Sequence, residues 1–241
     1  MNLYTNGCSF TAGTIVDQSL LGNKKFGKPD CVNWTSFCKK GQYGTVDYFD
    51  TIVNNAIEGG SNHRLFRQTT DFINETENLD DWIFVLQLSD PVRFELFYEK
   101  YGAWIGIIKD MHFTEDRVLQ ETADVVKEVE DFFIRLIMPT VFLTRTEQEG
   151  IFELYNMVNT FIELCKYKNI KYLITGMSSK CMPKENKINI LMPTNFAKPI
   201  SIVAGKNVIS NTDSHPDEAG HKLFARYIID EIKNYERFTK L

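Results

Sequence analysis

The chain has 241 residues, of which 43% are hydrophobic and 24% are charged, and its formal net charge is -5. This length suits one α/β domain with a sizeable core, and the composition is that of an ordinary globular protein rather than of a disordered chain or a coiled coil. The acidic balance and the lack of a dense basic run in the sequence argue against nucleic-acid binding.

The cysteines and the N-terminus predict an intracellular protein. The five cysteines are odd in number and form neither a CxxC pair nor a zinc pattern, so we expect free thiols and no metal site. No charged-then-apolar leader precedes the first strand, and no apolar run approaches the roughly 18 residues of a membrane span. We therefore expect a cytoplasmic protein that does not bind membranes. Release by lysis or assembly into a larger particle is compatible with this expectation, because neither route requires a signal peptide.

A short strand over residues 2 to 7 runs directly into a turn that displays a serine, Asn6-Gly7-Cys8-Ser9. Asn6 and Gly7 tolerate the positive φ that a sharp reversal needs, and such a turn can lift Ser9 above a sheet edge. Ser9 is then either a nucleophile served by a distant histidine or the N-cap of the next helix. Cys8 competes with Ser9 for the role of nucleophile, because a thiolate near a helix N-terminus would be activated; the position in the turn favours Ser9.

The next part of the chain alternates apolar runs with amphipathic segments. We expect strands near residues 51–57, 82–88 and 170–175, as parallel neighbours of the first strand in one sheet. We expect helices on both faces of that sheet, beginning near residues 62, 147 and 217. This alternation predicts a three-layer α/β/α fold with a mostly parallel central sheet, in a single domain over residues 1–241.

Two segments interrupt the alternation. Residues 93 to about 144 are longer than a simple crossover and include a helical stretch from Val118 to Met138, which predicts an inserted helical elaboration. The aromatic residues of this insertion either stack on a sugar or pack the inserted helices. Residues 177 to 210 contain three prolines, and we expect a short strand there, from Ile200 to Ala204.

A histidine near the C-terminus has the surroundings expected of a catalytic base. Pro216 is placed to open the last helix, which leaves His215 on the loop before it, with Asp213 close enough to orient the imidazole ring. His221 has no such arrangement and is expected to be structural. His63 follows a glycine pair and either contacts substrate or faces solvent.

The two ends of the chain together resemble the SGNH (GDSL-like) hydrolases, whose flavodoxin-like fold carries a Gly-Asp-Ser type turn after the first strand and an Asp-x-x-His-Pro type loop near the C-terminus. The resemblance implies that Ser9 is the nucleophile, His215 the general base and Asp213 its orienting partner, with no metal or cofactor. It also requires the Ser9 hydroxyl to lie about 2.6 to 3.5 Å from a ring nitrogen of His215. The chain departs from the family pattern at both of these motifs: Cys8 stands where aspartate is usual, and Asp213 lies two residues before the histidine rather than three.

The resemblance also implies groups that bind the oxyanion. The family uses a glycine after the second strand, which Gly60 fits, and an asparagine after the third, where this chain has no Gly-x-Asn-Asp. Asn62 is the preferred further donor, because it follows the Gly60 turn and carries an uncharged amide. Arg93 is second. The Arg93 guanidinium either donates to the oxyanion, binds an anionic substrate group or forms a surface ion pair.

These features predict a serine esterase that forms an acyl-enzyme on Ser9 and acts on a small-molecule or carbohydrate ester. An O-acetyl ester of a carbohydrate is preferred, because the family includes such esterases and the insertion offers aromatic side chains. The alternative is a binding or structural protein that keeps the fold and has lost efficient catalysis. The sequence makes no prediction of the oligomeric state.

Overall fold

The computed structural model describes residues 1–12, 33–40, 48–57, 60–98, 103–107, 146–182, 195–210 and 213–238. For some residues in these ranges only the backbone is described, and Asp213 is one of them. The elements in chain order are β1 (Asn2–Asn6), α1 (Ser9–Ala12), η2 (Trp34–Phe37), β2 (Ile52–Asn54), α2 (Asn62–Glu75), β3 (Trp82–Leu88), β4 (Phe94–Tyr98), β5 (Ala103–Ile107), α5 (Glu147–Lys168), β6 (Lys171–Gly176), η6 (Ser179–Cys181), α6 (Ile200–Ala204), β7 (Val208–Ser210), β8 (Asp213–Pro216) and α7 (Glu218–Phe238).

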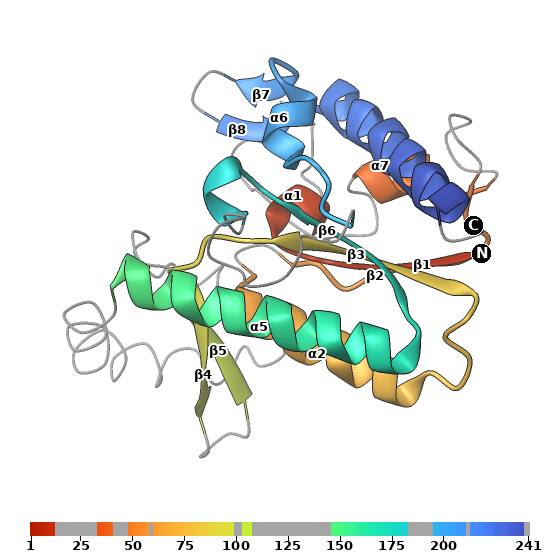
Figure 1. Ribbon diagram of the computed structural model, residues 1–241. Coiled ribbons are helices and arrows are strands. Elements are labelled where there is room, and N and C mark those ends of the chain that lie inside the picture. The colour runs from red at the N-terminus through yellow and green to blue at the C-terminus, as the bar shows by residue number, and fades with distance from the viewer. Residues whose placement is uncertain are drawn as a thin grey trace.

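Four parallel strands form the central sheet in the order β2-β1-β3-β6 (Figure 1). In the register of β1, Thr5 lies opposite Asn54 of β2, and Asn6 lies opposite Leu86 of β3. The predicted set of four parallel neighbours is therefore confirmed. Because β1 lies between β2 and β3, the segments that follow these three strands emerge side by side at one edge of the sheet, where open α/β sheets place their ligand sites.

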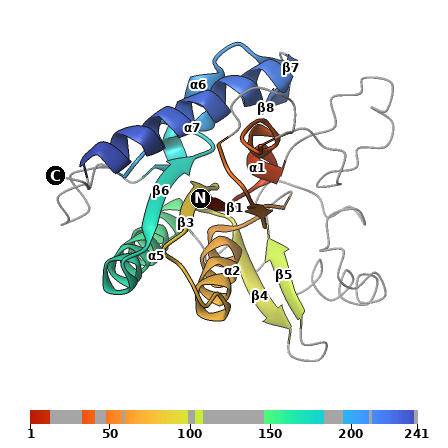
Figure 2. The same ribbon diagram turned by 90° about the vertical axis from the view of Figure 1, so that its right-hand side faces the viewer.

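Helices cover both faces of the sheet, so the three-layer α/β/α fold is confirmed. Side chains of a strand alternate between the two faces. Figure 2 shows α7 on one side of the sheet, and α2 and α5 on the other. The α7 side buries, among others, Leu3, Ile83, Val85, Leu173, Phe224 and Ile228. The opposite side buries, among others, Tyr4, Phe84, Leu86, Leu65, Leu154 and Tyr172.

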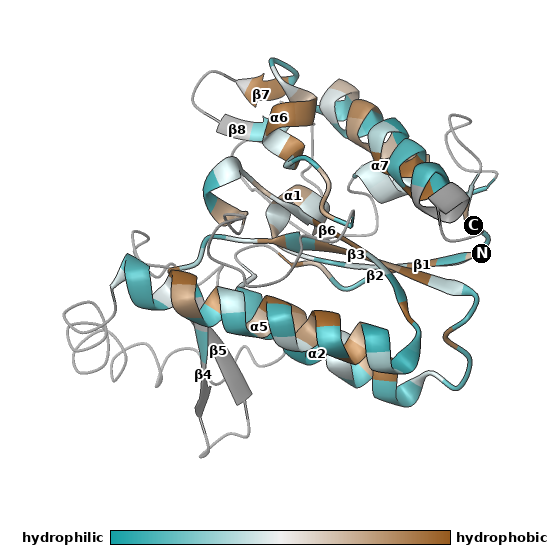
Figure 3. Cartoon of the chain, viewed as in Figure 1, coloured by the Kyte–Doolittle hydropathy of each residue, from teal (hydrophilic) through white to brown (hydrophobic). Residues whose placement is uncertain are grey.

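Capping interactions define both ends of the long helix α5. At the start of α5, the Thr146 hydroxyl accepts from the Glu149 amide while the Glu149 carboxylate accepts from the Thr146 amide, a capping box. At its end, Asn169 adopts the left-handed conformation with φ 55°. Figure 3 shows apolar and polar residues alternating along α5 and α7, as expected of helices with one buried side.

The structure differs from the sequence predictions in three places. The insertion begins with an antiparallel hairpin formed by β4 and β5, which the sequence did not predict, and the predicted helical stretch from Val118 to Met138 lies outside the described residues. Residues 200–204 form helix α6 rather than a strand: Ile200 and Ala204, one helical turn apart, are buried, whereas Ile202, which would share their face in a strand, is 53% exposed. Residues 213–216 form strand β8, paired with β7, rather than a loop.

No helix in the described part of the chain is both long enough and apolar enough to cross a membrane.

Candidate active site

Ser9 and His215, which are 206 residues apart in the sequence, meet at the edge of the sheet. Ser9 is the first residue of α1, directly after β1, and His215 lies on β8, which contacts α1 (Figure 1). The Ser9 Oγ and His215 Nε2 are 2.7 Å apart, within the range that the sequence analysis required. When Nε2 is unprotonated, the Ser9 hydroxyl donates to it, which is the contact that lets an imidazole act as the base for a serine nucleophile.

The four-residue helix α1 is held by polar side chains from other elements. Its Thr11 hydroxyl donates to Gln87 Oε1 at 2.8 Å and accepts from Trp34 Nε1 at 3.4 Å. Its last carbonyls accept from amide side chains: Asn54 Nδ2 lies 2.9 Å from Thr11 O, and Asn33 Nδ2 lies 3.2 Å from Ala12 O. These bonds satisfy groups that a short helix leaves unpaired, and they fix the helix that carries Ser9.

The turn before Ser9 needs its glycine for space rather than for backbone conformation. Among the described glycines only Gly205 has a positive φ, so the expectation of positive φ at Asn6 and Gly7 is wrong. A Cβ on Gly7 would instead lie 2.9 Å from the Gln87 Cβ, closer than side chains approach. The Asn6 side chain stabilises the turn, because its Oδ1 accepts from the Gly7 amide at 2.8 Å.

The Phe10 ring and the pairing of β8 with β7 hold His215 in place. The Phe10 ring lies 4.5 Å from the imidazole, centroid to centroid, and is tilted by 33°. The pairing of β8 with β7 fixes the backbone, and Asp217 Oδ1 accepts from the Gly220 amide at 2.8 Å to cap α7 directly after β8. Asp213 lies two residues before His215 on the same strand, and its side chain lies outside the described part of the structure.

The Cys8 thiol is a poorer nucleophile than its position in the turn suggests. Cys8 is fully buried, and burial raises the pKa of its thiol, while the positive charge of Arg93 acts in the opposite direction as a smaller effect. A thiol with a raised pKa stays protonated at neutral pH, and only the thiolate attacks. This environment favours Ser9 over Cys8.

Two predicted oxyanion donors already have partners within the fold. The Gly60 amide donates to the Ile57 carbonyl at 3.2 Å, and a Cβ on Gly60 would lie 2.7 Å from the Gly7 carbonyl, so the glycine turn packs directly against the serine turn. Asn62, which is 1% exposed, donates from Nδ2 to Ser89 O at 3.0 Å and accepts at Oδ1 from Ser89 N at 2.9 Å. Asn62 therefore ties the start of α2 to the end of β3.

The loop after β3 carries donors that the fold leaves unused. Arg93 is half-buried, and its Nη1 atom is buried. In the part of the chain that the structure describes, Nη1 has no acceptor and the guanidinium has no carboxylate partner. This arrangement argues against the surface ion pair. The Ser89 hydroxyl is likewise buried and unpartnered. Sequence reasoning singled out Arg93 but missed Ser89, because nothing in the sequence indicates that a serine hydroxyl is buried.

Two further histidines in the described part of the chain, His221 and His63, lie outside the Ser9–His215 contact. His221 is 1% exposed on α7, and both of its ring nitrogens lack a hydrogen-bond partner within the described residues. Burial, with a smaller effect from His215, lowers the pKa of His221 to about 3, so its ring is neutral. His63 Nε2 lies 3.4 Å from a Glu153 carboxylate oxygen, which joins α2 to α5.

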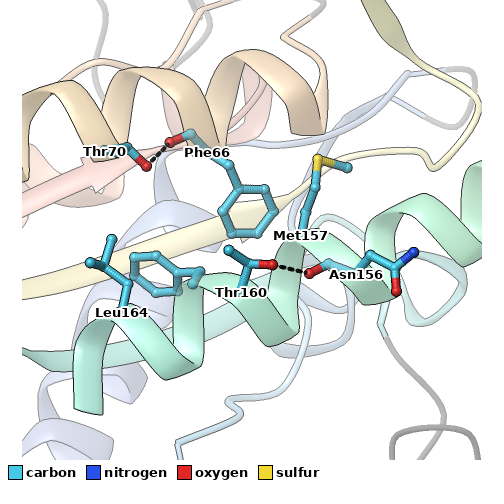
Figure 4. Close-up of a pocket in the computed structure, with 7 residues that line it drawn as sticks. Phe66, Thr70, Asn156, Met157, Thr160 and Leu164 are labelled. Carbon is cyan, nitrogen blue, oxygen red and sulfur yellow. Dashed lines mark hydrogen bonds between the residues drawn. The ribbon is translucent and has the colours of Figure 1, made fainter. Parts of the chain in front are cut away.

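A shallow groove between α2 and α5 lies away from these residues (Figure 4). Two hydroxyls in it, on Thr70 and Thr160, donate to carbonyls of their own helices at 2.8 Å. The groove therefore offers few polar groups with which to act on a substrate. Among the described residues no group of three histidine, cysteine or acidic side chains is placed to hold a metal ion.

No family model, curated protein or solved structure matches the chain.

Proposed function

We propose that the chain is a serine hydrolase that cleaves an ester through an acyl-enzyme on Ser9. The observation that carries this proposal is the 2.7 Å contact between Ser9 Oγ and His215 Nε2 at the edge of a parallel sheet. His215 takes the Ser9 proton as the hydroxyl attacks the ester carbonyl, and then gives that proton to the leaving alcohol. In the second half of the reaction His215 takes a proton from the water that attacks the acyl-enzyme, and returns it to Ser9 Oγ as the bond to the acyl group breaks and the acid leaves. Asp213, by the family resemblance, holds the imidazole in the required tautomer.

The proposed oxyanion site uses the amides of Ser9 and Gly60, with Asn62 as a further donor. The Gly60 amide bonds to Ile57 O at 3.2 Å, so an oxyanion must compete for that hydrogen. The Asn62 amide has two N–H groups, and donation to Ser89 O uses one of them. The other is left for the developing charge. Loss of one such donor typically lowers turnover by about 100-fold to 1000-fold, so these competing bonds bear directly on the rate.

The same bonds support a second candidate, a binding or structural protein with little catalysis. If the Gly60 amide keeps its bond to Ile57 when substrate is present, and Asn62 serves only Ser89, then Ser9 and His215 lack most of the donors that acyl transfer needs. Such a protein would bind an ester without hydrolysing it.

The substrate class in this proposal is a small-molecule or carbohydrate ester, with an O-acetyl ester preferred because the family that the chain resembles includes such esterases. The chemistry requires no metal or cofactor. The proposed location is the cytoplasm.

A panel of aryl and acetylated-sugar esters separates the two candidates. The wild type should release product from at least one ester, and Ser9→Ala should reduce that rate to the uncatalysed level. Ser36→Ala is the matched control, because Ser36 lies on η2 with a side chain that contacts Asn33 rather than His215. Activity that survives in Ser9→Ala would refute the proposed mechanism, and binding without turnover in the wild type would support the second candidate.

A further inference from the structure

The loop that follows β3 is fixed from two sides. Asn62 binds both backbone groups of Ser89, at 3.0 Å and 2.9 Å. On the other side, Gly150 of α5 lies so close to the Pro91 carbonyl that a Cβ on residue 150 would overlap it. A loop held in this way presents the side chain of Arg93, two residues after Pro91, from a rigid base. Because β3 is the parallel neighbour of β1, this base stands beside the turn that carries Ser9.

Arg93 is a cation without a partner in the described part of the chain. Its Nη1 is buried and has no acceptor, although a buried guanidinium N–H without an acceptor lowers stability. The fold does provide a carboxylate for a nearby arginine: Arg67 Nη2 lies 3.1 Å from Glu95 Oε2, on the strand that follows this loop. Glu95 thus neutralises Arg67 and leaves the charge of Arg93 available.

The positive charge of Arg93 acts electrostatically on the turn that carries Ser9. It lowers the pKa of the Cys8 thiol, which burial otherwise raises, and Cys8 directly precedes Ser9. The Ser89 hydroxyl, on the same loop, is a second donor that has no acceptor among the described residues, and Ser89 is 1% exposed. Other buried polar atoms of the described residues also lack partners, such as the ring nitrogens of His221, but Arg93 and Ser89 place two such donors on one loop beside Ser9, which points to an acceptor that a ligand supplies.

We propose that Arg93 binds a singly charged oxyanionic group of the substrate, a carboxylate or a phosphodiester, so that the ester cleaved at Ser9 is an anionic one. This inference rests on the proposed function and narrows its substrate class. A single guanidinium balances one negative charge, and its planar fork matches two oxygens of a carboxylate or a phosphate. In this role Arg93 selects the substrate and does not bind the oxyanion of the reaction.

The kinetic test compares matched ester pairs that differ in one carboxylate. Mono-4-nitrophenyl succinate and 4-nitrophenyl butyrate place the difference on the acyl side, and 4-acetoxybenzoate and phenyl acetate place it on the alcohol side. Arg93→Gln should lower kcat/KM for the charged member of at least one pair about tenfold or more relative to the neutral member, the loss expected for a charge-assisted hydrogen bond. Arg226→Gln removes the same charge from an exposed position on α7 and should leave the ratio unchanged.

Two kinetic results would overturn the proposal. If Arg93→Gln lowers kcat/KM equally for both members of each pair, then Arg93 acts on the reaction's own oxyanion. If Arg93→Gln behaves like Arg226→Gln, then Arg93 contacts no substrate.

A binding measurement decides the proposal if the wild type cleaves none of these esters faster than Ser9→Ala, a result that counts against the proposed function alone. Calorimetric titration of Ser9→Ala with benzoate and with dimethyl phosphate, repeated in the Ser9→Ala/Arg93→Gln double variant, measures anion binding without catalysis. Affinity for either anion that falls about tenfold or more in the double variant supports the proposal, and the tighter of the two anions identifies the group. Equal affinity in the two variants, or no binding of either anion, refutes it.

Discussion

His221 should make the protein less stable as the pH falls below neutrality. Its ring is 1% exposed, both nitrogens lack partners within the described residues, and burial lowers its pKa from 6.5 to about 3. In the unfolded chain the ring takes a proton near pH 6.5, whereas in the folded protein it does not until about pH 3. Protonation therefore favours the unfolded state. The contribution of the neutral ring is fully present above pH 6.5 and is lost progressively below it.

The size of this effect follows from the pKa difference. Each pH unit between the two pKa values changes the free energy of unfolding by about 1.4 kcal/mol, so lowering the pH from 7 to 5 should remove about 2 kcal/mol through His221 alone. Replacement by glutamine removes the titration and keeps a polar side chain of similar length. The pH-dependent loss should then be about 2 kcal/mol smaller in His221→Gln than in the wild type.

Urea unfolding followed by tryptophan fluorescence, at pH 8, 7, 6 and 5, measures this difference. The interval from pH 8 to 7 is the internal control, because His221 is neutral in both the folded and the unfolded state there. Parallel curves for the wild type and His221→Gln between pH 7 and pH 5 would show that the buried ring is not held neutral, and would refute the reasoning.

Three further substitutions test the contacts that build the site. Asn62→Ala should lower the free energy of unfolding by about 2 to 5 kcal/mol, because it leaves two buried backbone groups of Ser89 without partners. It should also lower turnover more than it weakens substrate binding. A loss of stability below about 1 kcal/mol in urea unfolding would contradict the first expectation. Gly60→Ala introduces a Cβ 2.7 Å from the Gly7 carbonyl, which should displace the turn that carries Ser9. We expect kcat to fall by about 100-fold while circular dichroism shows that the protein remains folded. An unchanged kcat would show that the turn adapts to the added methyl group. Thr11→Val removes the hydrogen bonds to Gln87 and Trp34 and should lower the free energy of unfolding by about 1 to 3 kcal/mol, measured by thermal unfolding. An unchanged stability would show that Gln87 and Trp34 form other hydrogen bonds.

The sequence predicted the elements whose signals are local. The apolar run from Trp82 to Leu88 is β3 to the residue, because a central parallel strand is buried on both faces and carries a continuous apolar pattern. Helix α5 begins at Glu147, where the capping box indicates a start. The contact between Ser9 and His215 was predicted for the same reason, because each residue stands in a short motif that is visible without the rest of the chain.

The sequence did not predict features that depend on contacts between distant segments. A short strand was expected over residues 200–204, but Ile202 is exposed while Ile200 and Ala204 are buried, and this pattern of burial is helical. The role of Gly7 depends on how closely Gln87 approaches, and the bonds between Asn62 and Ser89 join residues 27 positions apart. Such distances follow from packing, which no local pattern encodes.

The central claim is that His215 activates Ser9 as a nucleophile, and covalent labelling tests it most directly. A fluorophosphonate reacts with activated serines, so intact-protein mass spectrometry of the wild type should show a single adduct, and peptide mapping should locate it at Ser9. His215→Gln should slow its formation by at least about 100-fold, since it removes the general base. Ser9→Ala should form none. An unlabelled wild type, or an adduct that persists in Ser9→Ala, would contradict the account.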